Sequence, residues 1–318
     1  MATTRPKLTE LRVLGAKLET TTGTQIAIAA GDGAFNVRNM KVTPTIVFNE
    51  RPGQGSFSSL PGVTGQQSAK LTFEIEMAGS GTGTAPAWAT TFLPAMGYYQ
   101  SAGTNNIFAP ISGPLPTNNS TLTMFAYEDG IAQVLVGCVG TGKIMLEAGK
   151  PALLSCEFEG AYIGPTTVAN ITPTYPTVLP PVFQNSTVTV GSFGPQISKA
   201  EIDLGNKIYM RPDASTNSAT GFVSGVIVDR KVKGSMDPEC TALATRNWYS
   251  NLVASTTEAL TINIGVAANH NAIQIAGPVV QCSKRERGDR SGIMTDDVDL
   301  QFNRSAAAGD DELTITIP

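Results

Sequence analysis

Hydrophobic and polar side chains alternate with a period of two along much of the chain, most regularly on both sides of residues 148–151. The apolar positions of this stretch are Ile144, Leu146, Leu154, Cys156 and Phe158. Such alternation places one set of side chains in a core and the other in water, as in a half-buried β-strand. Gly149 supplies the backbone freedom of a turn, and Pro151 is tolerated at the start of a strand. Residues 136–160 therefore predict an antiparallel hairpin that closes a β-rich domain.

The same period predicts further strands in the first half, at 11–18, 24–29, 39–48, 70–77, 122–127 and 131–137. Residues 50–65 are rich in Gly, Ser and Pro and predict a long loop, which is usually functional or interfacial. Trp88, Phe92 and Met96 recur at helical spacing and predict a short helix with one face in the core. Thr84 is its expected cap, with Pro86 in the first turn.

The second half repeats these landmarks in the same order. Arg211–Pro212 follows Arg51–Pro52 at the interval that separates Trp248 from Trp88. Strands are predicted at 197–204, 232–236, 260–261, 272–280 and 298–302, and Asp237–Pro238 predicts the start of a second helix carrying Trp248, Leu252 and Val253. Matching intervals argue for an internal duplication, with chance resemblance between β-rich halves as the alternative.

The domain organisation follows from this repeat. We expect a mainly β protein with β domains at 1–165 and 183–318, each with one short helix. The Pro-rich, nearly uncharged residues 166–182 between them predict a semi-rigid extended linker. A chain of 318 residues is long enough for two medium domains or one large domain.

Composition narrows the class of protein. Charged residues make up 15% of the chain, against roughly 25% in an average soluble domain. Neighbouring copies could cover the weakly charged surface, or the chain could be an ordinary neutral β-protein. The net charge is −4 and basic residues form no stripe with interleaved aromatics, which argues against tight nucleic-acid binding.

The sequence predicts neither a secretory signal nor a membrane-spanning segment. The N-terminal residues lack the apolar segment of a secretory signal, and no apolar run reaches 18 residues. We therefore expect synthesis in a cytosol and no membrane anchor. The four cysteines lack metal-site spacing and are predicted to be buried free thiols: Cys138, Cys156, Cys240 and Cys282.

Several stretches could carry chemistry, and each departs from the pattern that its chemistry needs. Residues 137–143 (GCVGTGK) fit a phosphate-binding loop, but Ile144 replaces the required Ser or Thr and a strand follows. The acidic groups at 296–299 and 310–312 lack the spacing of a calcium loop. We expect them to be solvated or to face a lumen.

The remaining candidates are a mixed-charge stretch and a histidine. Residues 283–290 carry both signs of charge and predict an exposed loop. His270 is the one histidine, whereas a triad or a three-His zinc site needs partners, so we expect a surface-loop residue. We predict no catalytic, cofactor-binding or metal site, and a protein that is not an enzyme. A nucleotide hydrolase using 137–143 is the enzymatic alternative.

A series of short packing motifs occurs in a particular order: Glu50–Arg51–Pro52, GTAPAW at 83–88, GCVG at 137–140, EAGKP at 147–151, FEG at 158–160 and the turn at 187–194 ahead of Asp203–Leu204–Gly205–Asn206. Their order and spacing resemble the major tail tube proteins of long, non-contractile-tailed (siphovirus-type) bacteriophages, most clearly over 40–165. No EAGK-like turn occurs near residue 292, so the closing hairpin of the second half is expected to differ.

The resemblance implies a fold and an assembly. It implies two tandem, duplicated tail-tube domains, each a β-sandwich or barrel flanked by one short helix. Such domains form rings that stack helically into a hollow tube. With two domains per chain, a homotrimer of pseudo-six-fold symmetry would close the ring that single-domain subunits close as a hexamer. Edge strands would then pair across subunits instead of meeting water, and residues 50–65 and 97–119 would reach an adjacent ring.

The resemblance also implies a location and partners. The protein would be a structural component of the virion, assembled in the host cytoplasm. Its partners would be further copies of itself, the tape measure protein, the tail terminator and the distal tail proteins. Double-stranded DNA would pass through an acidic lumen during ejection without tight binding.

A carbohydrate-binding or host-adhesion β-sandwich of a phage fibre or spike is the alternative function. Such a protein needs exposed aromatic side chains along a groove. Aromatic residues make up only 7% of this chain, and both Trp residues fall on predicted core stripes.

Overall fold

Antiparallel β-structure dominates the fold, as the alternation predicts. The computed structural model describes residues 5–101, 106–112, 120–215, 218 and 220–318. The first half holds helix α1 (Ala87–Ala95), the short 3-10 helix η1 (Ala30–Gly33) and strands β1 (Arg12–Leu18), β2 (Val37–Arg51), β3 (Leu60–Glu76), β4 (Tyr98–Gln100), β5 (Asn106–Pro110), β6 (Leu122–Glu128), β7 (Ile131–Glu147) and β8 (Leu153–Thr167). The prediction of a mainly β fold is confirmed.

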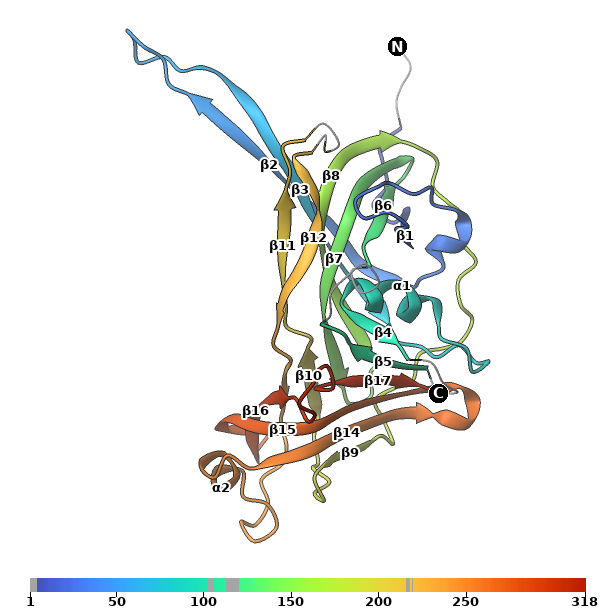
Figure 1. The fold of residues 1–318 in the computed structure, drawn as a ribbon. Coiled ribbons are helices and arrows are strands. Elements are labelled where there is room, and N and C mark those ends of the chain that lie inside the picture. Colours follow the sequence, from blue (N-terminus) through green and yellow to red (C-terminus); the bar gives the residue numbers. More distant parts are fainter. Residues whose placement is uncertain (1–4, 102–105, 113–119, 216–217, 219) are drawn as a thin grey trace.

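The second half has a similar sequence of elements. It holds helix α2 (Trp248–Val253), the 3-10 helix η2 (Ala267–Asn269) and strands β9 (Thr187–Val190), β10 (Lys199–Asp203), β11 (Asn206–Pro212), β12 (Phe222–Arg230), β13 (Lys233–Met236), β14 (Thr257–Val266), β15 (Asn271–Arg290), β16 (Ile293–Asn303) and β17 (Thr314–Ile317). In Figure 1, β14 to β16 run across the base of the molecule, while β6 to β8 stand above them.

One hydrogen-bonded array joins the two halves. Its main path runs β2-β3-β8-β7-β10-β13-β16-β15-β17-β5-β4, with β6 and β1 attached to β7, and β14 and β9 attached to β15. The halves meet where β10 pairs antiparallel with the end of β7, with Ile202 opposite Ile144. Strands β11 and β12 form a separate ribbon beside β7 (Figure 1).

The predicted closing hairpin is confirmed as β7 and β8. Ile144 lies opposite Leu154, and both side chains are buried. The turn between the strands places Gly149 at φ +77°, where glycine has no steric penalty. Pro151 precedes β8 and forms an isolated bridge to Val182.

Helix α1 covers this hairpin and supplies the centre of the core. The phenyl ring of Phe92 lies 4.8 Å from that of Phe35, 5.2 Å from that of Phe73 and 5.7 Å from that of Phe158, measured between centroids. The Trp88 indole donates a hydrogen bond to the carbonyl oxygen of Ala78 (2.8 Å). The predicted core-facing stripe is thus confirmed. Pro86, not Thr84, is the residue at the N-cap, and it offers no side-chain acceptor.

The predicted start of the second helix is wrong. Helix α2 begins ten residues later, where Asn247 accepts a hydrogen bond from the amide of Ser250 (2.9 Å). Asp237 is buried and accepts hydrogen bonds from the amides of Ser198 and Lys199, both 2.9 Å. A local Asp–Pro signal was overridden by these long-range acceptor contacts.

Two other local predictions are corrected. Residues 24–29 form no strand: the amide of Ile26 donates to the Thr123 side chain rather than to a strand backbone. The loop predicted at 50–65 is reduced to residues 52–59, because β2 continues to Arg51 and β3 begins at Leu60. Position 62, inside β3, suits a glycine, because a Cβ there would lie 2.3 Å from an atom of the Phe48 ring.

Two connecting segments complete the fold. The stretch 97–119, which the resemblance expects to reach an adjacent ring, contains β4 and β5; its residues 102–105 and 113–119 lie outside the described part. Residues 168–181, all described, contain neither helix nor strand. The Asn170 amide group donates to the Leu11 carbonyl (2.9 Å), and the Pro181 carbonyl accepts from the Ala152 amide (3.2 Å). This segment therefore lies against the body at both ends.

Candidate assembly surfaces

The glycine-rich stretch 137–143 is part of strand β7 and does not form a phosphate-binding loop. Gly137 adopts φ +61°, and a Cβ there would lie 2.8 Å from the Cα of Ser224 on β12. Gly140 faces the ring of Phe158, and a Cβ added at Gly140 would lie 2.6 Å from that ring. The glycines allow close packing of β12 and Phe158, and the Lys143 ammonium pairs with Glu201 (3.4 Å).

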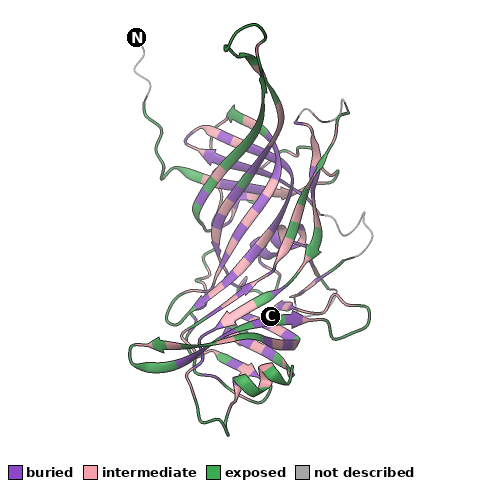
Figure 2. Cartoon of the chain, turned by 90° about the vertical axis from the view of Figure 1, so that its left-hand side faces the viewer, coloured by how far each residue is buried: buried purple, intermediate pink, exposed green. Residues whose placement is uncertain are grey.

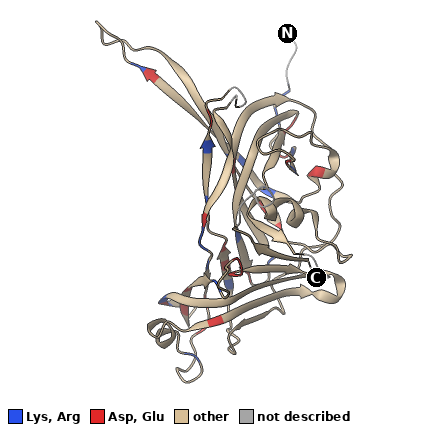
Figure 3. Ribbon diagram, in the orientation of Figure 1, with Lys and Arg blue, Asp and Glu red and all other residues tan. Residues whose placement is uncertain are grey.

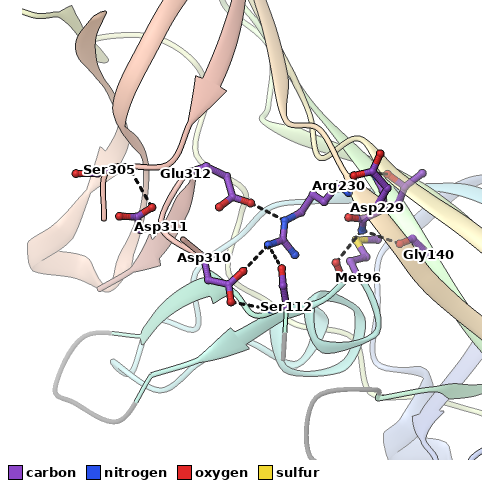
Figure 4. A network of polar contacts seen from close by, with 11 residues as sticks. Met96, Ser112, Gly140, Asp229, Arg230, Ser305, Asp310, Asp311 and Glu312 are labelled. Atoms are coloured by element: carbon purple, nitrogen blue, oxygen red, sulfur yellow. Dashed lines mark hydrogen bonds and ion pairs between the residues drawn. The ribbon is translucent and has the colours of Figure 1, made fainter. Parts of the chain in front are cut away.

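The acidic group 310–312 is occupied by protein partners. Figure 4 shows the buried Arg230 side chain between Glu312 and Asp310, at 2.6 and 3.0 Å, with Ser112 accepting a further hydrogen bond at 2.9 Å. Asp311 points away from Arg230 and accepts from the amides of Ser305 and Ala306. Asp310 and Glu312 fasten the C-terminal loop to β12, and Asp311 is hydrogen-bonded within that loop. These contacts correct the expectation of solvated or lumen-facing charge.

Replacing Arg230 with Met should destabilise the protein by about 1–3 kcal/mol, because two partly buried carboxylates lose their partner. The urea unfolding midpoint of the unassembled chain measures this loss. Lys231→Met is the matched control, since the neighbouring Lys231 side chain is 73% exposed and pairs only with Asp229 in the described residues. Equal midpoints for the two variants would contradict the role assigned to Arg230.

The acidic group 296–299 lies on β16, and residues 283–290 lie on β15, which pairs with it as a hairpin. Residues 283–290 are therefore strand, and the prediction of an exposed loop is wrong. Asp296 is buried beside the guanidinium groups of Arg285 (2.5 Å) and Arg287 (3.3 Å). Asp297 and Asp299 remain exposed. Figure 3 shows charge gathered on this hairpin and on β10, whereas the outer part of the β2–β3 hairpin, residues 46–63, carries only Glu50 and Arg51.

The histidine and the cysteines have structural positions. His270 is exposed in the turn after η2, as predicted, and its carbonyl accepts from the Gly81 amide (3.1 Å). All four cysteines are free and three are buried, as predicted, whereas the prediction of a buried thiol is wrong for Cys240, which is partly exposed. Burial raises the pKa of the Cys138 and Cys156 thiols well above the usual value. Across the described ranges, His, Cys, Asp and Glu form no cluster suited to a metal ion.

The β2–β3 hairpin projects from the body as an arm, here defined as residues 46–63 (Figure 1). Figure 2 shows that its outer part is exposed along both strands. The exposed side chains include large apolar ones: Ile46, Val47, Phe48, Phe57, Leu60 and Val63. Phe48 is 61% exposed in this structure. A cluster of apolar side chains of this size on an extended hairpin is typical of a protein–protein interface.

Two long strands also present open hydrogen-bonding edges. In the part of the chain that the structure describes, β2 pairs only with β3. Beyond Gln281, the described pairings of β15 are to β16 alone. Open edges of this length can pair with another chain, and soluble monomers usually protect them.

Among the described residues, no helix is long and apolar enough to cross a membrane.

Replacing Glu159 with Gln should stabilise the protein at neutral pH. Partial burial on β8 raises the pKa of this carboxyl; Lys70 opposes the rise and Glu157 adds to it. Because the folded-state pKa exceeds the unfolded one, ionisation weakens the fold. This penalty is absent below the unfolded value of 4.5 and grows as pH rises through the folded pKa.

Thermal melts of the Glu159→Gln protein should therefore lie above wild type at pH 7 and converge with it near about pH 4. Glu157→Gln is the control, because Glu157 pairs with Lys70 (2.7 Å) and its loss should give no such gain. A Glu159→Gln protein less stable than wild type at pH 7 contradicts the argument.

Comparison with known protein families identifies the class of protein to which these surfaces belong. A family model described as "Phage tail tube protein" matches residues 9–318. The chain belongs to the phage tail tube protein family. A search of curated proteins finds no match. This tail tube protein is thus a structural component of the phage tail and belongs to the virion.

Membership confirms the resemblance inferred from the ordered motifs. It favours the tube over the adhesion alternative and implies self-assembly with other tail proteins. The Gly/Ser/Pro content of residues 50–65 indicated the projecting arm, but no sequence pattern indicated the open edges of β2 and β15. Only the strand order reveals which edges lack a partner, because the pairings join residues far apart in sequence.

Proposed function

We propose that this tail tube protein forms homotrimeric rings of pseudo-six-fold symmetry and that the rings stack helically into a hollow tube. Each chain would contribute two tail-tube domains, residues 1–165 and 183–318, joined by the extended segment 166–182. DNA would pass through the tube into the host on ejection. The tape measure protein, the tail terminator and the distal tail proteins would be its further partners, with assembly in the host cytoplasm.

The observation that carries this proposal is the repetition of strand pairing in the two halves. The first half has the order β2-β3-β8-β7, and β7 continues to β6 and β1. The second half has β10-β13-β16-β15, and β15 continues to β14 and β9. In each half a Trp-led helix, α1 or α2, precedes the β6 or β14 strand. A chain built of two like units can occupy two of six like positions in a ring.

The remaining features suit stacking and a passage for DNA. The arm extends beyond the body, so its apolar side chains could be covered by an adjacent ring. The chain has 26 acidic and 22 basic residues, and acidic side chains alternate along the non-core face of β3 and β8, at Glu74, Glu76, Glu157 and Glu159. A lumen of this character would not attract phosphates, so DNA could slide.

Negative-stain microscopy of the purified chain tests the proposal. Under assembly conditions we expect rings and hollow tubes, and native mass spectrometry of unstacked rings should give three chains. A protein that stays strictly monomeric at high concentration would count against the tube. Rings of six chains would leave the tube in place and refute the duplicated, trimeric form.

A further inference from the structure

The proposal concerns the surface by which one copy contacts the next, and it rests on the proposed ring. We infer that the open edge of β2 in one copy pairs antiparallel with the open edge of β15 in the next, with Thr43 opposite Glu286. Each chain would thereby continue the strand array of its neighbour. The partner is a second copy of this chain, because the same kind of junction already exists inside it.

The internal junction is the template. Strand β10 pairs on one side with β13 and on the other with the end of β7. Within the repeated strand order, β10 holds the place of β2, and β7 holds the place of β15. The equivalent of the β7–β10 junction is therefore β15 with a β2 strand. In the described chain neither edge pairs with a further strand, although the Arg12 guanidinium donates to the Met40 carbonyl of β2 (3.0 Å). A second copy can supply the missing strand at both edges.

Residue equivalence follows from reading across the sheet. In the first half Gly140 lies opposite Phe158, Phe158 opposite Leu71, and Leu71 opposite Val42. In the second half the same path runs through Cys282, Leu300, Gly234 and Ile202. This path makes Val42 equivalent to Ile202. Their separation equals that of Trp88 from Trp248, an interval obtained independently from the sequence.

The starting point of that path has its own support. Strand β6 shifts register against β7 between Leu122, opposite Cys138, and Met124, opposite Leu135. Strand β14 shifts in the same way against β15, where Val280 and Gly277 take the places of Cys138 and Leu135. Matching these irregularities makes Cys138 equivalent to Val280, and therefore Gly140 equivalent to Cys282.

The register of the new junction can then be stated. Strand β15 has one extra residue between Cys282 and Lys284, so Lys143 corresponds to Glu286. Inside the chain, Lys143 lies opposite Asp203, and Asp203 corresponds to Thr43. Between copies, Glu286 should therefore lie opposite Thr43, with Lys41 two residues along the same face.

Charge supports this register. Inside the chain, the Lys143 ammonium reaches diagonally to Glu201 (3.4 Å), two residues from its direct partner. The equivalent positions hold Glu286 and Lys41, which is the same ion pair with its signs exchanged. Lys41, Thr43 and Glu286 are all exposed in the single chain, where Glu286 pairs with Lys284 of its own strand (3.0 Å). Exposed ion pairs of this kind contribute little free energy, so Glu286 can exchange this partner for Lys41 of a neighbour. Opposite charges at neighbouring cross-strand positions stabilise sheet pairing.

A disulfide test measures the pairing and its register. In an antiparallel pair, opposite Cα atoms lie about 4.5–5.5 Å apart, within the range that a disulfide spans. Rings of the Thr43→Cys/Glu286→Cys protein should, on oxidation, give covalent dimers and trimers on non-reducing denaturing gels. Thr43→Cys/Asp297→Cys is the matched control. Asp297 is exposed and lies opposite Glu286 on β16, one strand farther from the junction, so this pair should stay monomeric.

The outcomes separate this pairing from the ring itself. Rings that form while Thr43→Cys/Glu286→Cys stays monomeric would overturn the pairing and leave the tube intact. Equal cross-linking of the control, or of either single variant, would also overturn it. A chain that forms no rings at all would refute the tube and this junction together. As a second readout, Lys41→Glu should reduce ring formation at least tenfold at low salt, and Lys41→Glu/Glu286→Lys should restore it.

Discussion

Replacing Phe92 with Ala is expected to destabilise the unassembled chain by about 3–5 kcal/mol, through lost apolar burial and the cavity left behind. The side chain is fully buried and packs against three other phenyl rings. These belong to Phe35, which follows η1, to Phe73 on β3 and to Phe158 on β8. Its removal opens the space where the helix meets the sheet. Urea unfolding monitored by tryptophan fluorescence measures the loss.

The chain offers a matched control for this substitution. Phe57 is fully exposed at the end of the arm, so Phe57→Ala should leave the free energy of unfolding unchanged within about 0.5 kcal/mol. The two variants remove the same atoms from opposite environments. Similar losses at both positions would show that the core described around helix α1 is wrong.

Shortening the arm is expected to abolish tubes while leaving the body folded. Residues 47–66 can be replaced by Asn-Gly, because Ile46 lies opposite Gln67 in the β2–β3 ladder and this dipeptide favours a two-residue hairpin turn. The deleted part contributes exposed apolar side chains and one hydrogen bond, from the Gln66 side chain to the Gly221 carbonyl (3.0 Å), but no buried apolar residue. If these side chains dock on an adjacent ring, the shortened chain should form single rings without stacks in electron micrographs.

Thermal melting and a surface control make this result specific. The melting temperature of the shortened chain should stay close to that of wild type. Leu179→Asp changes another exposed apolar residue, 80% exposed on the segment 168–181, and should leave tubes intact. Tubes of normal length from the shortened chain would refute the role of the arm in stacking.

Sequence patterns predict those parts of this fold in which short-range alternation agrees with the final packing. The β7–β8 hairpin and the α1 stripe follow this rule, since Ile144, Leu154 and Phe92 all lie in the core. Asp237 shows the opposite case. Its sequence context resembles a helix cap, yet the carboxylate serves two amides near residue 198 and the guanidinium of Arg290.

The assembly surfaces were the least predictable part, for a physical reason. An open edge is defined by which strands pair, and the partners of β2, β7 and β15 are set by contacts across the whole chain. Likewise, the sequence predicted that Asp310 and Glu312 would be solvated or would face a lumen, but the fold places Arg230 between them (Figure 4). Residue types alone did not indicate that these carboxylates hold a loop in place.

In the proposed assembly, the strand array inside one chain would continue into a larger array between chains. The edge that β10 offers to β7 is filled internally, whereas the equivalent edge of β2 has no partner within the described chain. Backbone groups left open on long strands favour association. In the proposed ring these groups would be paired without leaving another open edge.

A cryo-electron microscopy reconstruction of the assembled tube tests the central claim most directly. The account predicts three chains in each ring, six similar β units around a hollow channel, and a lining sheet in which β15 of one chain hydrogen-bonds to β2 of the next. Six chains in each ring, or sheets that stop at every subunit boundary, would contradict it.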